Sequence, residues 1–257
     1  MSPLRRLARG LGYDLVPLRK AKDPARQLDV VLARAGITVV LDVGANTGQY
    51  ARRLRAGGYA GRIVSFEPLE GAHAALLAAA KADPRWEIAP RTALGAGDGL
   101  VEIEVAAESD MSSILPQNEL LRRISPTSRV TAREQVAIAR LDDLALRYLG
   151  ADDRAFLKVD VQGYEAQVLD GAWDLLPRLS GIQLELSLVP LYEGETGFRE
   201  MLDRMAGLGF EPHLILPGYF ERKIARQLQV DVVFMPSGGS GDAPGGRLDG
   251  RTLPRSD

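Results

Sequence analysis

One loop constrains the fold of this chain more than any other segment. Aliphatic and β-branched residues over 37–43 lead into Gly44-Ala45-Asn46-Thr47-Gly48, and a helical pattern follows. The segment therefore predicts a buried strand, a tight turn and the start of a helix. Gly44 and Gly48 leave room where the backbone must approach a ligand, and the first N–H groups of the helix can face a polar or anionic group. This pattern is typical of the loop that binds a nucleotide cofactor in a parallel α/β sheet.

Glu67 supports that interpretation. It stands nineteen residues after Gly48, at the end of a second apolar run over 62–67. Neighbouring parallel strands end at the same edge of the sheet, so this carboxylate is expected beside the loop, where it can accept hydrogen bonds from both hydroxyls of a ribose. A glycine pair alone occurs in many α/β turns. The acidic residue at this spacing is what predicts a nucleoside site.

The composition of the loop separates two cofactors that use this geometry. The dinucleotide pattern G-x-G-x-x-G needs a second glycine to admit a pyrophosphate, and Asn46 stands at that position here. Asp42 precedes the loop. A carboxylate suits the ammonium and sulfonium charges of S-adenosylmethionine (SAM) better than it suits a pyrophosphate. The sequence therefore favours SAM over a nicotinamide dinucleotide.

Composition narrows the class of protein. A chain of 257 residues with 46% hydrophobic and 26% charged residues is ordinary for one globular domain. The net charge of −2 offers no overall electrostatic reason to bind nucleic acid, and zero cysteine excludes disulfides, thiolate metal sites and cysteine nucleophiles. No run approaches the ~18 apolar residues of a membrane span, and residues 1–20 lack the apolar core of a signal peptide. We expect a cytoplasmic protein.

The two ends of the chain differ from the middle. Residues 1–26 are basic, with leucines at helical spacing, which predicts either weak contact with an anionic membrane surface or a short helix packed on the domain or a partner subunit. Residues 237–257 are rich in Gly, Pro, Ser, Arg and Asp and predict a disordered tail. The domain itself is expected over 27–236.

Within the domain, apolar runs alternate with helical stretches, which predicts an α/β fold with a mostly parallel sheet and helices on both faces. We expect strands near 37–43, 62–67, 86–90, 154–160, 181–187, 210–217 and 230–235, and helices near 48–57, 69–82, 141–149, 164–176 and 196–208.

Residues 95–140 interrupt this alternation of strands and helices. Two alternating runs, 100–105 and 135–139, predict an antiparallel pair around a polar segment, 106–133. An insertion of this length is usually functional or mobile, so we expect a substrate lid.

A second motif, Phe156 to Glu165, points to chemistry. Apolar residues lead into Asp160 at the expected end of a strand, Gly163 permits a turn, and Glu165 opens the next helix. Asp160 is either a simple helix cap or a functional carboxylate at the rim of the ligand crevice. Lys158, Glu165 and Glu185, which lie at the same rim, favour the functional reading because a cap does not need such charged neighbours.

These motifs together resemble the FkbM family of SAM-dependent methyltransferases over about residues 37–235. The resemblance is carried by 42–48, Phe66-Glu67-Pro68, Ala93-Leu94-Gly95, Ser112-Ser113, 141–144, 158–165 with 168–172, and 230–234. It implies a seven-stranded Rossmann-like methyltransferase core whose last strand is antiparallel, and O-methylation of sugar hydroxyls or natural-product scaffolds. Two departures stand out: Gln162, where relatives often have Glu, and Ala96, where an acidic residue is usual.

The mechanism we expect is direct methyl transfer from SAM to an acceptor hydroxyl, with the protein aligning the reactants and removing a proton. Asp42 and Gly44 are expected to hold the methionine portion, Glu67 the ribose, and Ala93 with Leu94 the adenine. Further cofactor contacts are assigned to Ala45, Asn46, Gly48, Pro68 and Asp160. Asp160 is the expected general base, with Lys158 steadying it and Glu185 beside it.

Three alternatives stay open at this stage. A magnesium ion on Asp160 and Glu185 would acidify the hydroxyl, although further ligands are not identifiable and the leading reading has no metal. The acceptor is expected to be a small molecule or glycan, but an N- or protein-directed methyltransferase on the same core is compatible with the residues. A cofactor-binding protein without chemistry is less compatible, since it would not need both the cofactor carboxylates and the rim carboxylates.

Overall fold

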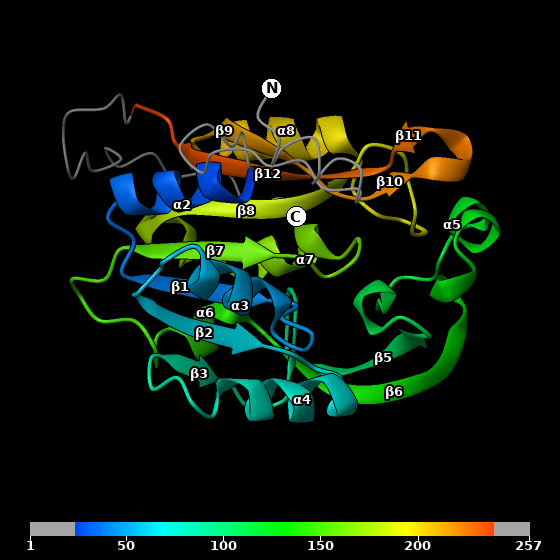
Figure 1. The fold of residues 1–257 in the computed structure, drawn as a ribbon, viewed down its shortest axis with the longest axis horizontal. Helices are drawn as coiled ribbons and strands as arrows, with labels where there is room; N and C mark the ends of the chain where they lie inside the picture. The colour runs from blue at the N-terminus through cyan, green and yellow to red at the C-terminus, as the bar shows by residue number, and fades with distance from the viewer. Residues whose placement is uncertain (1–23, 239–257) are drawn as a thin grey trace, which may run out of the picture.

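Seven strands form one central sheet in the computed structural model, which describes residues 24–238 (Figure 1). In spatial order they are β3 (Trp86–Ile88), β2 (Arg62–Phe66), β1 (Val39–Val43), β7 (Ala155–Val159), β8 (Leu179–Ser187), β12 (Gln229–Pro236) and β9 (Phe210–Pro217). The pairs from β3 to β8 are parallel, whereas β12 runs antiparallel to both β8 and β9. The expected sheet, with its antiparallel last strand, is confirmed, and each strand lies within two residues of its predicted bounds.

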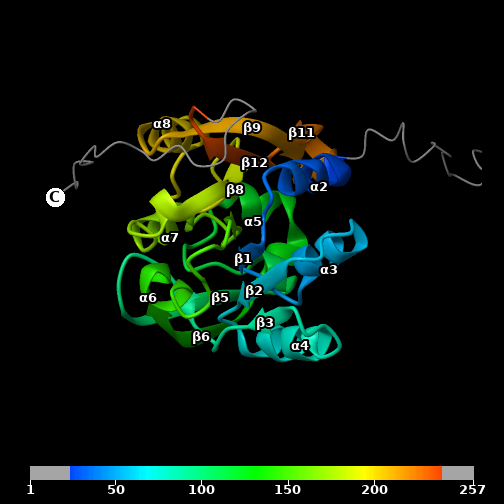
Figure 2. The same ribbon diagram turned by 90° about the vertical axis from the view of Figure 1, so that its left-hand side faces the viewer.

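Helices cover both faces of this sheet (Figure 2). One face carries α2 (Pro24–Arg34), α3 (Gln49–Ala56) and α4 (Glu70–Ala80), and the other carries α6 (Leu141–Ala145), α7 (Glu165–Asp170) and α8 (Phe198–Gly207). Strand residues alternate between the two apolar cores: Val40 packs with the first set of helices, and Val39 and Leu41 pack with the second. Because β1 is buried on both sides, the loop after it starts from a fixed position.

Two helix predictions need correction. The helix expected over 164–176 ends at Asp170, and turns over 171–175 lead to the short 3₁₀ helix η4 (Leu176–Arg178). Gly171 lets the carbonyl oxygen of Gly95 approach closely, because a Cβ there would lie 1.9 Å from it. The helix expected over 141–149 ends at Ala145. Helix α2 was not predicted, although its buried Leu28 and Leu32 follow helical spacing.

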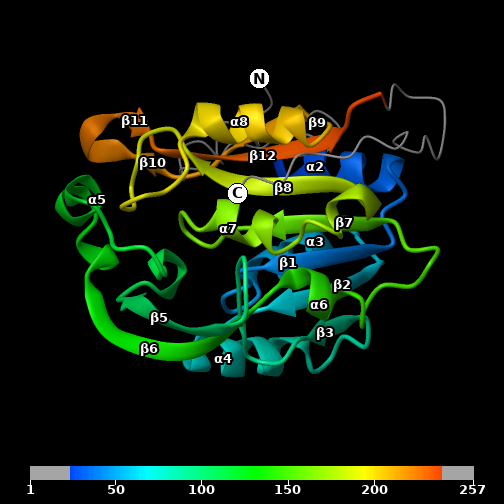
Figure 3. The ribbon, with the colours of Figure 1, turned by 180° about the vertical axis from the view of Figure 1, so that it is seen from behind.

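The insertion, residues 95–140, extends beyond the carboxyl ends of the parallel strands (Figure 3). As predicted, β5 (Gly99–Ala106) and β6 (Val130–Ala139) form an antiparallel pair, and β4 (Ala93–Leu94) adds to β6 in parallel. Between them lie η2 (Ser109–Met111), α5 (Glu119–Ile124) and η3 (Pro126–Ser128). The hairpin β10 (Phe220–Glu221) and β11 (Arg226–Gln227), joined by η5 (Arg222–Ile224), lies at the same end of the molecule.

The predictions for residues 1–23 and 239–257 lie outside the described residues. Between residues 24 and 238, no helix has the length and apolar character needed to cross a bilayer.

Candidate active site

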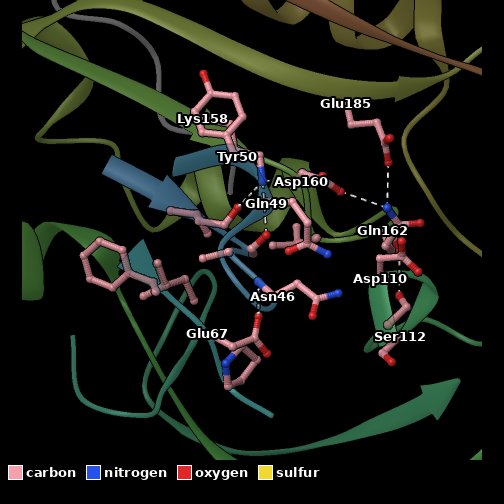
Figure 4. Close-up of a pocket in the computed structure, with 18 of the residues that line it drawn as sticks. Asn46, Gln49, Tyr50, Glu67, Asp110, Ser112, Lys158, Asp160, Gln162 and Glu185 are labelled. Carbon is pink, nitrogen blue, oxygen red and sulfur yellow. Dashed lines mark hydrogen bonds and ion pairs between the residues drawn. The ribbon is translucent and has the colours of Figure 1, made fainter. Parts of the chain in front are cut away.

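A pocket of about 440 Å³ opens at the carboxyl ends of β1, β2, β7 and β8 and at the amino end of the antiparallel strand β12 (Figure 4). The residues predicted for the site line it, with two exceptions, Asp42 and Gly48. Its lining residues include Gly44, Ala45, Asn46, Tyr50, Arg53, Glu67, Pro68, Ala93, Leu94, Ser109, Asp110, Ser113, Lys158, Asp160, Gln162, Gln183, Glu185 and Asp231. The topology therefore brings most of the predicted residues to one place.

Glycines shape the loop between β1 and α3. Gly44 and Gly48 have φ of 73° and 89°, and Asn46 also has a positive φ, 47°. A Cβ at Gly44 would lie 1.8 Å from the carbonyl oxygen of Asp160, and one at Gly48 would lie 2.5 Å from the ring of Trp86. Gly44 thus permits the close approach of two strand ends beside the pocket. Gly48 makes room for the ring of Trp86 and does not line the pocket.

Glu67 holds this loop in place through two hydrogen bonds. The carboxylate is buried, and its Oε2 accepts a hydrogen bond from Asn46 N at 2.8 Å while Oε1 accepts one from Leu69 N at 2.9 Å. Burial raises the pKa of Glu67 to about 7, against the opposing effect of these two hydrogen bonds. Each oxygen keeps a second lone pair. Glu67 can therefore hold the loop and accept hydroxyl donors in the pocket at the same time.

A buried polar chain runs beneath the loop. Trp86 Nε1 donates to Ser65 Oγ at 2.9 Å, and Ser65 Oγ donates to Asp42 Oδ2 at 3.0 Å. The other oxygen of Asp42, Oδ1, faces Lys158 Nζ at 3.4 Å. Asp42 is completely buried and does not line the pocket. Asp42 therefore contacts Lys158, which lines the pocket, and does not contact a ligand in the pocket directly.

Lys158 is the central cation of the site. Its Nζ donates to Gly44 O at 3.1 Å and lies 3.4 Å from Asp160 Oδ2. It also lies 5.3 Å from the centre of the Tyr50 ring. Burial alone would lower the pKa of Lys158, but the carboxylates of Asp160 and Asp42 raise it above its ordinary value. Lys158 therefore remains protonated and stabilises charge; it does not act as a base.

Asp160 and Glu185 are joined by one amide group. Gln162 Nε2 donates to Asp160 Oδ1 at 2.8 Å and to Glu185 Oε2 at 2.6 Å. Burial, followed by repulsion from Asp160, raises the pKa of Glu185 well above its ordinary value. Helix α7 begins at Glu165 with Tyr164 as its N-cap and no side-chain capping bond, so Asp160 is not a helix cap. The side chain of Asp160 faces the pocket, 31% exposed.

The expected magnesium ligands do not form a metal site. Among residues 24–238, no group of three or more His, Asp or Glu side chains is arranged to hold a metal ion. The amide nitrogen of Gln162 lies between Asp160 and Glu185, where a shared cation would sit. A magnesium ion on these two carboxylates is therefore not supported.

Sequence reasoning missed a second polar chain on the far wall. Tyr50 OH donates to Gln183 Oε1 at 2.9 Å, and Gln183 Nε2 donates to Asp231 Oδ1 at 3.0 Å. Burial raises the pKa of Asp231. Asp231 is the partner of Glu185 in the β8–β12 register, so two carboxylates stand side by side. A charged residue inside the apolar run of the last strand was the available signal.

The insertion closes one side of the pocket. Ser109 Oγ donates to Asn46 Oδ1 at 3.0 Å, and Ser113 Oγ donates to Gln162 O at 2.6 Å. Tyr192 OH donates to Gln162 Oε1 at 2.8 Å, and the ring is buried. Tyr192 is thus a loop anchor and is not free to stack on a substrate. Asp110, whose pKa burial raises, also lines the pocket from this segment.

The chain is similar to known methyltransferases in sequence and in fold. Residues 42–212 match the family model described as the methyltransferase FkbM domain. No curated protein matches the chain. Similar solved structures include a proposed methyltransferase from Thermobifida fusca (11% identity, TM-score 0.49, 84% of this chain and 80% of that one). A proposed RNA methyltransferase from Pyrococcus horikoshii has 12% identity and a TM-score of 0.44, covering 94% of this chain and 100% of that one. A TehB-like SAM-dependent methyltransferase from Corynebacterium glutamicum has 11% identity and a TM-score of 0.41, covering 90% of this chain and 94% of that one. Identities this low transfer no substrate.

Proposed function

Because this chain belongs to the FkbM methyltransferase family and is therefore a SAM-dependent methyltransferase, we propose that it methylates a hydroxyl group of a small molecule or glycan. The acceptor class we favour is a sugar, a glycolipid or polysaccharide, or a natural-product scaffold. The observation that carries this proposal is Asp160, a partly exposed carboxylate that faces the pocket between Lys158 and Gln162. Such a group can accept the proton that a hydroxyl loses on methylation.

The residues of the pocket fit SAM. Glu67 has lone pairs left for the two ribose hydroxyls, and the apolar side chains of Ala93 and Leu94 suit the adenine. Carboxylates outnumber cations on the walls: Glu67, Asp110, Asp160, Glu185 and Asp231 against Lys158 and Arg53. Burial raises the pKa of four of these carboxyl groups, those of Glu67, Asp110, Glu185 and Asp231, so their oxygens serve mainly as hydrogen-bond acceptors. Acceptors suit the ammonium group of SAM better than the phosphates of a nucleic-acid acceptor.

In the proposed mechanism, bound SAM supplies an activated methyl group on a positively charged sulfur. The protein aligns the acceptor oxygen and takes its proton. Lys158 lies 3.4 Å from Asp160 Oδ2 and orients that carboxylate. The insertion, bonded to Asn46 and Gln162 through Ser109 and Ser113, limits the access of water.

A hydroxyl acceptor is favoured over an amine. An amine attacks through its free lone pair and loses a proton afterwards, so it does not need a carboxylate held by a buried cation. An alcohol is a far weaker acid and gains from a base in contact during transfer. N-methylation and methylation of a protein are the alternatives that the following experiment distinguishes.

The experiment is incubation of the protein with radiolabelled SAM and an extract of the cells that produce it. The proposal expects label in a glycan or small-molecule fraction that resists protease and nuclease, with a mass gain of one CH₂ unit on oxygen by tandem mass spectrometry. Label that protease or nuclease releases, or a methyl group on nitrogen, would contradict it.

The insertion leads to a separate prediction. Residues 106–133 are expected to move when ligands enter, because Ser109 and Ser113 bond to Asn46 and Gln162 at the pocket wall. Amide hydrogen exchange in 106–133 should therefore be fast in the free protein and slow when the demethylated cofactor and the acceptor are bound. The amides of the buried strand β1 serve as the internal reference. Slow exchange in 106–133 without ligand, unchanged on binding, would show that this segment is not a lid.

A further inference from the structure

Gln162 joins four parts of the site. Its Nε2 donates to Asp160 on the β7 side and to Glu185 on β8, at 2.8 and 2.6 Å. Its Oε1 accepts from Tyr192 OH at 2.8 Å, and its carbonyl oxygen accepts from Ser113 of the insertion at 2.6 Å. The residue has φ of 57°, the left-handed region that side chains rarely adopt. All its side-chain polar atoms are used, as Figure 4 shows for the two carboxylates.

The chemistry of an amide explains this arrangement. Two carboxylates that approach one point repel each other unless donors or a cation lie between them. The amide of Gln162 supplies two N–H donors from one nitrogen and one acceptor on the opposite side. Ionised carboxylates only accept, so they orient the amide nitrogen toward themselves, and Tyr192 donates to the amide oxygen on the opposite side. A Glu at this position would present only acceptors.

We infer that Gln162 is a positioning residue that aligns Asp160 and Glu185 and takes the place between them that a cation would otherwise occupy. The inference rests on the proposed function for its catalytic meaning. Its structural content can be tested on the protein alone. If the amide bridges the two carboxylates, Gln162→Glu converts the bridge into a cluster of three carboxylates. Such a cluster needs either a proton or a divalent ion.

The matched control is Gln227, whose Nε2 also bridges two acceptors, Tyr219 O at 3.1 Å and Gln229 O at 2.7 Å, outside the pocket lining. Thermal unfolding of the wild type, Gln162→Glu and Gln227→Glu is followed from about pH 5.5 to about pH 8, with and without about 5 mM MnCl₂. Gln162→Glu should lose stability as pH rises, and Mn²⁺ should restore it. The wild type and Gln227→Glu should not respond to Mn²⁺. A Gln162→Glu protein that ignores Mn²⁺ would overturn the inference.

Activity gives the second readout. Without a metal, the rise of the transfer rate with pH should move at least about one pH unit upward in Gln162→Glu, because a third carboxylate disfavours the ionised base. Tyr192→Phe, which removes the donor to Gln162 Oε1 and the longer bond to Met111 O, should lower the rate by roughly threefold to tenfold without changing the affinity for SAM. An unchanged pH profile in Gln162→Glu would overturn the positioning role. Failure of the wild type to bind SAM by calorimetry would instead contradict the proposed function.

Discussion

Replacing Asp160 with Asn should lower turnover at least a hundredfold while the affinity for SAM changes by less than about 1 kcal/mol. Asn keeps the size of the side chain but cannot take a proton. It also has only one acceptor oxygen, which can face either Lys158 or Gln162, whereas the carboxylate contacts both. The measurement is the rate of methyl transfer at saturating SAM, together with calorimetry of SAM binding.

The control for this variant is Asp170→Asn, which removes a carboxylate bonded to Arg204 at 2.6 Å on the surface of α7. It should transfer methyl groups at the wild-type rate. Wild-type activity should also be insensitive to EDTA, since an amide nitrogen and not a metal joins the rim carboxylates. If Asp160→Asn folds, binds SAM and turns over within about threefold of the wild type, Asp160 is not the base.

Glu67→Ala should weaken SAM binding by roughly 1.5–3 kcal/mol, about 10-fold to 150-fold, the scale for hydrogen bonds to a charged group. The loss has two sources: acceptors for the ribose disappear, and Asn46 N loses its partner. Calorimetry with SAM and with NAD measures the effect, and NAD should bind neither protein. The control is Glu221→Ala, because Glu221 also accepts from the N–H two residues ahead, Lys223 N at 2.8 Å. Equal SAM affinity in Glu67→Ala and the wild type would remove Glu67 from the cofactor site.

The same residue predicts a pH dependence. The pKa of Glu67 is raised from 4.5 to about 7 in the folded protein. The folded state therefore holds this proton more tightly than the unfolded state, and the free protein should lose stability as pH rises from about 4.5 to about 7. Ionised Glu67 is the better acceptor for ribose hydroxyls, so SAM should bind more tightly as pH rises through 7. Titrations from about pH 6 to about pH 8 should show this gain in the wild type and not in Glu67→Ala.

The centre of the sheet was predictable because its strands β1 and β7 are buried on both faces. Val39–Val43 and Ala155–Val159 are each apolar but for one charged residue and too short for a helix, so their positions follow from the sequence. The ends of α6 and α7 did not follow. Gly171, the residue after α7, packs against the carbonyl of Gly95, which is far away in the chain and leaves no space for a side chain. Local propensity does not contain that contact.

The site was predictable where a residue follows directly from a strand end. Gly44, Glu67 and Asp160 do so, and all three reach the pocket. Tyr50 and Asp231 were missed because their places depend on which helix covers which face and on β12 inserting between β8 and β9. Asp42 was assigned to the ligand, yet it points below the loop toward Ser65 and Lys158. The direction of a side chain at a strand end is set by the pleat and the neighbouring strand, which one chain segment does not reveal.

The packing of Trp86 against Gly48 makes tryptophan fluorescence a probe of the cofactor loop. The chain has two tryptophans, and Trp173 packs against the core on the opposite face of the sheet. With Trp173 replaced by Phe, fluorescence would come from Trp86 alone, whose indole touches the cofactor loop and is hydrogen-bonded to Ser65. The fluorescence of Trp86 would then report ligand binding at the loop and movement of the loop in real time, without a labelled ligand.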